Sequence, residues 1–155
     1  MKRIFLMTIV VMCVVLSSFD VAVADINAQV KISPNTLNLK SKGKWINCEI
    51  RLPQEYDVAD IDTATIILQS PLLGTIAPDR VIIDPVNQVA NLKFRRSELQ
   101  AIVEAGEQVV LTVSGNVSVL GPDPLNPLGP PVAVPTLFSG TDTIKVINPV
   151  GKKPK

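Results

Sequence analysis

The sequence predicts an all-β protein, folded as an antiparallel β-sandwich with one short helix. Three observations lead to this fold class. Apolar and polar residues alternate along many short segments, as they do in half-buried strands. Clusters of Gly, Pro, Asn, Asp and Ser separate these segments and mark turns. Helical spacing of apolar residues occurs at one place in the chain. Many short strands joined by turns are typical of a sandwich.

The first 24 residues are predicted to form a cleavable secretory signal peptide. Lys2 and Arg3 supply the basic start, residues 4–16 are almost entirely apolar, and Ala-Val-Ala at 22–24 supplies a small-residue cleavage site. The apolar run is shorter than the roughly 20 residues that a membrane-spanning helix needs. We therefore expect export, cleavage after Ala24, no membrane insertion after cleavage, and a secreted or extracytoplasmic location: the periplasm, the cell surface or the extracellular medium.

The remaining chain has the composition of one neutral domain, expected at 25–148, with a basic tail at 149–155. Removing Lys2, Arg3 and Asp20 from the 15 basic and 14 acidic residues leaves 13 of each. A neutral chain without a large basic patch lacks the electrostatic footprint of a nucleic-acid binder. Cys48 becomes the only cysteine, so an internal disulfide is excluded and packing must stabilise the fold.

In the first half of this domain the strand at 44–52 has the clearest pattern. Ile46, Cys48 and Ile50 alternate with Trp45 and polar residues, so the first set is expected to face the core. Weaker alternation or apolar runs predict further strands at 28–32, 36–40 and 63–68.

The second half contains the helix and the last strands. Ser97 and Gln100 fit a capping box, Leu99 begins helical spacing, and Gly106 fits the position after the helix. The apolar segment 72–83 is broken by glycine and proline and predicts two short strands or a strand and a loop. Strands are also expected at 88–94, 107–115 and 141–147.

A proline-rich loop is expected at 121–135, where six of the fifteen residues are proline. Proline lacks the N–H group that a central strand donates, so this segment predicts an extended connection between two strands. Connections of this length are uncommon and more often functional or disordered than structural. The candidate binding residues here are Pro122, Pro124, Pro127, Pro130 and Pro131.

The residues needed for common catalytic sites are missing. The chain contains no histidine, which removes Ser–His and Cys–His nucleophile systems and the usual zinc sites. Cys48 lies on the apolar face of its strand, where burial raises the thiol pKa and makes it unreactive. We therefore expect no enzyme activity. A hydrolase that uses an unrecognised carboxylate pair stays open as an alternative.

Asp57, Asp60 and Asp62 form a dense carboxylate cluster. Together with Asp84 they are the candidate ligands of a calcium ion, which accepts several oxygen ligands. Aspartate also favours turns, because its side chain accepts hydrogen bonds from nearby backbone N–H groups. The turn interpretation is favoured, and a calcium-stabilised accessory module is an alternative. No other cofactor is expected.

Trp45 is a candidate binding residue because the alternation places it off the core face. An exposed tryptophan could anchor a partner. The favoured interpretation is that Trp45 packs under the long loop or against the chain end.

Several strings resemble an Ig-like β-sandwich module that recurs in secreted and cell-surface proteins of bacteria and archaea. They are TLNLKSKGKW at 36–45, Leu-Pro at 52–53, YDVADID at 56–62, KFRR at 93–96, LTVSG at 111–115 and GTDTI at 140–144. The resemblance implies an Ig-like sandwich without enzyme activity, usually accompanied by other modules. Members often carry a calcium loop before the Lys-Phe strand. Here only Asp84 remains of its acidic residues, so that site is not carried over.

Together these observations predict an exported, non-catalytic module for binding or for cell-envelope or extracellular structure. Its partner would be a protein or an envelope component, contacted through the proline-rich loop or an exposed sheet edge.

Overall fold

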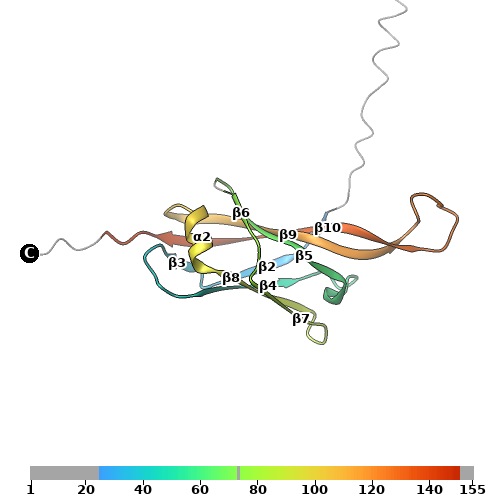
Figure 1. Cartoon of the computed structure of the whole chain (residues 1–155), viewed down its shortest axis with the longest axis horizontal. Coiled ribbons are helices and arrows are strands. Elements are labelled where there is room, and N and C mark those ends of the chain that lie inside the picture. Colours follow the sequence, from blue (N-terminus) through green and yellow to red (C-terminus); the bar gives the residue numbers. More distant parts are fainter. Residues whose placement is uncertain (1–24, 73, 151–155) are drawn as a thin grey trace, which may run out of the picture.

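The computed structural model describes residues 25–72 and 74–150 and places them in two β-sheets that pack face to face (Figure 1). The predicted all-β sandwich is confirmed. The expected signal peptide, residues 1–24, and residues 151–155 of the expected tail lie outside the described residues. Within the described part, no helix is long and apolar enough to cross a membrane.

The first sheet has the strand order β1-β10-β9-β5-β6, with β3 also beside β10. Its long strands are antiparallel, whereas β1 and β3 run parallel to β10. The strands are β1 (Ile26–Asn27), β3 (Thr36–Asn38), β5 (Ile61–Ser70), β6 (Gly74–Ile76), β9 (Gly106–Gly121) and β10 (Val132–Ile147).

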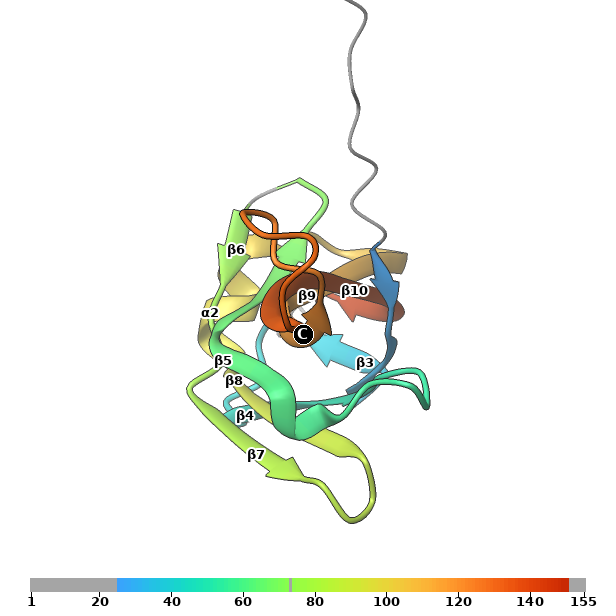
Figure 2. The same cartoon turned by 90° about the vertical axis from the view of Figure 1, so that its right-hand side faces the viewer.

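The second sheet has the order β2-β4-β8-β7 and is antiparallel throughout. Figure 2 shows the two sheets end-on, with the chain passing from one to the other. The expected apolar segment 72–83 forms two strands, one in each sheet. The strands of the second sheet are β2 (Gln29–Ser33), β4 (Trp45–Arg51), β7 (Arg80–Asp84) and β8 (Val89–Arg95).

The core lies between the sheets and follows the predicted alternation. Ile46, Cys48 and Ile50 of β4 are buried, while the residues between them face outward. Phe94 of β8 and Phe138 of β10 are the largest fully buried side chains. Removing such a side chain from water stabilises the fold by about 1.5–3 kcal/mol, so the two phenylalanines are principal contributors to the packing between the sheets.

The N-terminal strands β1 and β2 belong to different sheets, and the chain between them passes close to the backbone of β10. β1 pairs with β10, and β2 then pairs with β4 in the other sheet. Between them the Ala28 N–H donates to the carbonyl oxygen of Ser139 at 2.8 Å. A Cβ atom at Gly140 would collide with the Ala28 carbonyl group. Only glycine at position 140 lets the β10 backbone lie this close to the chain that joins β1 and β2.

The helix α2 (Arg96–Ile102) exists, but its predicted ends are wrong. Its N-cap is Arg95 without a side-chain cap, so Ser97 and Gln100 form no capping box. Gly106 begins β9 instead of following the helix. The Gln100 Nε2 group donates to the carbonyl oxygens of Asn38 and Ser41. These distant partners replace the local cap that the sequence motif favoured.

The proline-rich loop is shorter than expected. β9 continues to Gly121 and β10 begins at Val132, so the connection is 122–131 and Pro135 lies in a strand opposite Ser118. This part of β10 pairs only with β9, because β1 begins alongside Phe138. An edge strand tolerates a proline that a central strand would exclude.

Candidate binding site

The hairpin of β9 and β10 projects beyond the sandwich as an arm, defined here as residues 118–135. The last residue of β9 beside β5 is Val117, opposite Ile61. Farther along, the two strands pair only with each other, from Ser118 opposite Pro135 to Gly121 opposite Val132. Figure 1 shows this hairpin extending past the other strands at the end opposite α2. In the arm neither strand has a further strand beside it, although residues 55–60 lie beside the base of β9.

The tip of the arm is apolar and held by turns. Leu125 is 96% exposed and Leu128 is 99% exposed. The Asp123 carboxylate accepts from the Leu125 N–H at 2.8 Å, and the Asn126 carbonyl accepts from the Gly129 N–H at 2.9 Å. These bonds fix the loop around the exposed leucines. The five candidate prolines, Pro122, Pro124, Pro127, Pro130 and Pro131, are also exposed.

The arm is almost free of charge. Asp123 is the only charged residue between Glu107 and Asp142, and its carboxylate takes part in the turn at the tip. Depletion of charged residues with exposed apolar side chains is typical of the centre of a protein–protein interface. The arm therefore has the surface chemistry of a contact site.

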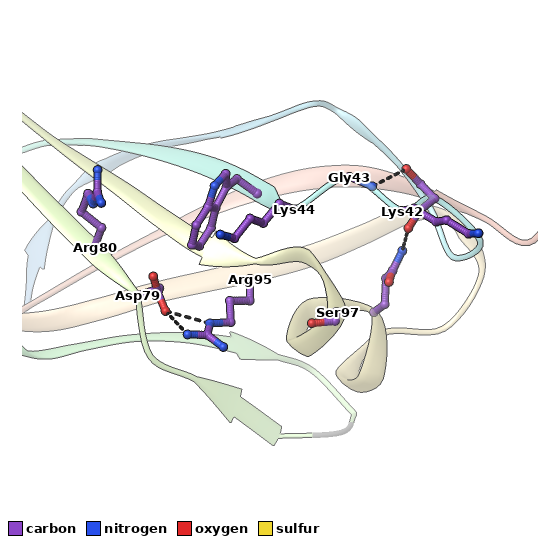
Figure 3. A pocket seen from close by; sticks show the side chains of 10 residues that line it. Lys42, Gly43, Lys44, Asp79, Arg80, Arg95 and Ser97 are labelled. Atoms are coloured by element: carbon purple, nitrogen blue, oxygen red, sulfur yellow. Dashed lines mark hydrogen bonds and ion pairs between the residues drawn. The ribbon is translucent and has the colours of Figure 1, made fainter.

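A different surface lies at the other end of the sandwich, where a groove of about 690 Å³ opens beside α2 (Figure 3). The loop before β4, the start of β7, the end of β8 and α2 form its walls. We call it the cationic groove. Its lining residues are Ser41, Lys42, Gly43, Lys44, Trp45, Asp79, Arg80, Arg95, Ser97 and Gln100.

Positive charge dominates this groove. Four of its lining residues are lysine or arginine, and Asp79 is the one carboxylate among them. Arg95 Nη2 lies 2.7 Å from Asp79 Oδ1, and this hydrogen bond and the Asp79 charge raise the pKa of Arg95. Neither Lys42 nor Arg80 forms a salt bridge within residues 25–72 and 74–150. The groove therefore attracts anions.

Trp45 is half-buried in the wall of the cationic groove. It starts β4 opposite Arg95, and the Lys44 Nζ atom lies 4.8 Å from the centre of its ring. Trp45 does not pack under the proline-rich loop, because it lines the groove beside α2, whereas the hairpin that carries this loop extends at the end opposite α2 (Figure 1). The alternative that Trp45 packs against the chain end stays a prediction, since residues 151–155 lie outside the described residues. The structure thus separates the candidate binding residues into two distant surfaces.

Hydrogen bonds from α2 hold the loop that carries Lys42, Lys44 and Trp45. Gln100 Nε2 donates to the Ser41 carbonyl oxygen at 3.1 Å. The Arg96 N–H donates to the Lys44 carbonyl at 3.0 Å, and Arg96 Nη2 donates to the Trp45 carbonyl at 3.2 Å. The backbone of this wall is therefore fixed before any ligand binds.

Three of the four aspartates weighed as calcium ligands hold turns. Asp57 accepts from the Ala59 N–H and caps the short helix η1 (Val58–Asp60), Asp62 accepts from the Ala64 N–H, and Asp84 accepts from Val86 and Asn87. The Asn87 side chain, followed by its backbone N–H, lowers the pKa of Asp84. Among the described residues no three acidic, His or Cys side chains are grouped to hold a metal. Calcium binding stays a hypothesis without a preformed site.

Several carboxylates line a small pocket of about 320 Å³ at the base of the arm. Glu55, Asp57 and Asp60 line it together with Tyr56. The Asp57 carboxylate accepts from the Ala59 N–H and from Gln88 Nε2. A hydrolase that uses a carboxylate pair stays a hypothesis.

Cys48 is buried in the core, as its place in the alternation predicted. Burial raises its pKa from 9.0 to about 12, and the charges of Asp142 and Glu49 add to the shift. A thiol with this pKa is protonated at neutral pH and does not act as a nucleophile.

Comparison with known proteins leaves the family open. No family model and no curated protein matches the chain. Among solved structures, the chain is similar to AggA, the major subunit of aggregative adherence fimbriae type I from Escherichia coli. The identity is 8%, the TM-score is 0.34, and the match covers 79% of this chain and 96% of AggA. A superposition at this level assigns neither family nor function.

Proposed function

We propose that this protein is an exported, non-catalytic binding module with an Ig-like sandwich, and that its arm contacts a protein of the cell envelope or the extracellular space. Export rests on the signal-peptide pattern of residues 1–24. The observation that carries the binding role is the exposed apolar tip at Leu125 and Leu128.

The energetics favour a partner at this tip. Two leucines held in water by an ordered turn gain about 25 cal/mol for each Å² of apolar surface that a partner covers. The turn bonds at Asp123 and Asn126 reduce the entropy lost on binding. The unpaired edge of β10 at 132–137 offers backbone groups to an added strand.

A non-catalytic role agrees with the chemistry of the side chains. The chain has no histidine, and its buried thiol is protonated. Calcium is not part of this proposal, because the carboxylates of Asp57, Asp62 and Asp84 accept hydrogen bonds from neighbouring backbone N–H groups.

The test is a crosslinking pull-down from the envelope fraction of the native host. In one variant Leu125→Ser and Leu128→Ser are combined, and in another an Asn-Gly turn replaces 122–131. We expect both to lose the specific partner by about tenfold or more, as hot-spot residues do. Val86→Ser is the matched control, because Val86 is 90% exposed on a turn outside the arm. Retention of every partner by both arm variants would exclude the arm as the contact site.

A further inference from the structure

We propose that the cationic groove binds an acidic polysaccharide, a glycan that carries carboxylate or sulfate groups. This inference concerns the end of the sandwich opposite the arm. It does not depend on the function proposed for the arm.

Unpaired positive charge in the cationic groove favours an anionic ligand. Lys42, Lys44 and Arg80 line one groove, and the single carboxylate there, Asp79, is already paired with Arg95. These cations lie along one groove, and each attracts an anionic group placed there. Arginine and lysine also donate charge-assisted hydrogen bonds to carboxylate and sulfate oxygens.

An aromatic ring lies among these cations. Trp45 lines the same groove, and the ammonium group of the exposed Lys44 lies over its ring. Lys44 is flexible and can turn to an incoming anion, which frees the ring face for the apolar face of a sugar. A flat aromatic surface beside cations matches a chain in which sugar rings and acidic groups alternate.

The shape and rigidity of the groove also suit a polymer. The groove is open to solvent, so a polymer can lie in it without its end entering a closed cavity. Figure 3 shows the side chains that line it. The backbone beneath Lys44 and Trp45 is held by Arg96 and Gln100. A preformed wall loses little entropy on binding, which suits weak contacts repeated along a polymer.

A single-stranded nucleic acid is the main competing ligand, because cations and an aromatic ring also bind it. Such sites stack successive bases on several aromatic side chains. Trp45 is the only aromatic residue in this groove.

The experiment uses the intrinsic fluorescence of Trp45, which is the only tryptophan in the chain. Protein purified from cells expressing the whole chain is titrated with heparin, which is sulfated, with polygalacturonate, which carries carboxylates, and with neutral dextran. A thymidine oligonucleotide is the fourth probe. We expect a saturable change in emission with heparin, polygalacturonate or both, which identifies the anionic group, and none with dextran.

Variants locate the site. We expect Lys42→Gln combined with Arg80→Gln to weaken binding about tenfold, since each exposed charged contact contributes a factor of about three to five. The matched control combines Lys31→Gln with Arg51→Gln, which removes two cations from the same sheet outside the groove. Circular dichroism checks that all variants fold.

Three results would overturn the proposal. One is the absence of binding to both acidic glycans. Another is an equal loss of affinity in the groove variant and its control, which would show non-specific attraction to the sheet face. The third is tighter binding of the oligonucleotide than of either glycan.

Discussion

The two ends of this sandwich differ in chemistry and in origin. The arm is one hairpin of residues close in sequence, nearly uncharged, with leucines exposed at its tip. The cationic groove is concave and combines residues from 41 to 100. One β-scaffold can therefore carry two independent contact surfaces, because a long hairpin needs only its own pairing whereas a groove needs the register of several strands.

The separation also has a consequence for binding. A partner that covers the apolar tip leaves the cationic groove exposed at the opposite end (Figure 1). The two proposed contacts therefore do not compete for the same surface. If the two ends are independent, a substitution at one end should leave the other unchanged.

The largest loss of stability is expected from a substitution at the root of the arm, where the hairpin enters the core. Phe138 is fully buried, and its ring packs over Gly115. Phe138→Ala is expected to lower the free energy of unfolding by about 3–5 kcal/mol, measured by urea denaturation. The tip variant with Leu125→Ser and Leu128→Ser is expected to change it by less than about 0.5 kcal/mol per site. A large loss from the tip variant would show that the arm is part of the core.

The next effect concerns Cys48, which lies in the core between the two ends. The thiol has a raised pKa in the folded chain, about 12 against 9.0. Stability is therefore unaffected below pH 9 and falls as the pH rises toward 12, by about 1.4 kcal/mol per pH unit, because only the unfolded thiol ionises there. Denaturation at a series of pH values measures this slope, and Cys48→Ala should remove it.

Thiol labelling at pH 8 gives a second readout of the same pKa. The folded thiolate is about a thousandfold scarcer than that of an unfolded chain, so labelling should follow unfolding. Variants of the arm tip or of the cationic groove should leave this protection unchanged. Rapid labelling in either one would show that the two ends are coupled through the core.

The smallest effect is expected at Gln100, which ties the wall of the groove to α2. Gln100→Leu removes the donor to the Asn38 and Ser41 carbonyls. It should cost about 1–2 kcal/mol of stability. It should also weaken heparin binding without removing a charge, as seen by titration of Trp45 fluorescence. Gln108→Leu, at an exposed site in β9, is the matched control and should change neither quantity. If Gln100→Leu left the heparin affinity unchanged, the hydrogen bonds that hold the wall would not contribute to binding.

Most of the fold could be predicted because alternation is a local signal. Ile46, Cys48 and Ile50 face the core as their spacing predicted, and the strands of the second sheet lie close to their expected ranges. The predicted strands 107–115 and 141–147 were too short, and the proline-rich stretch 121–135 was taken as a loop although Val132–Pro135 lie in β10. The exclusion of proline holds for central strands, and whether a strand is at an edge depends on its neighbours.

The candidate sites could be predicted only in part. The alternation placed Trp45 off the core face, and the prolines predicted an extended connection, but the cationic partners of Trp45 were not identified. The adjacent Lys44 was a usable signal in the sequence. Arg80 and Arg95 carried none, because they join the groove only through the pairing of β8 with β4 and β7.

Residue spacing and residue type are enough to predict the all-β class, the apolar face of β4 with its buried thiol, and a proline-rich connection between the last two strands. They do not predict how far the arm projects or which cations surround Trp45. Both depend on strand register and on where neighbouring strands end, which contacts between distant parts of the chain set.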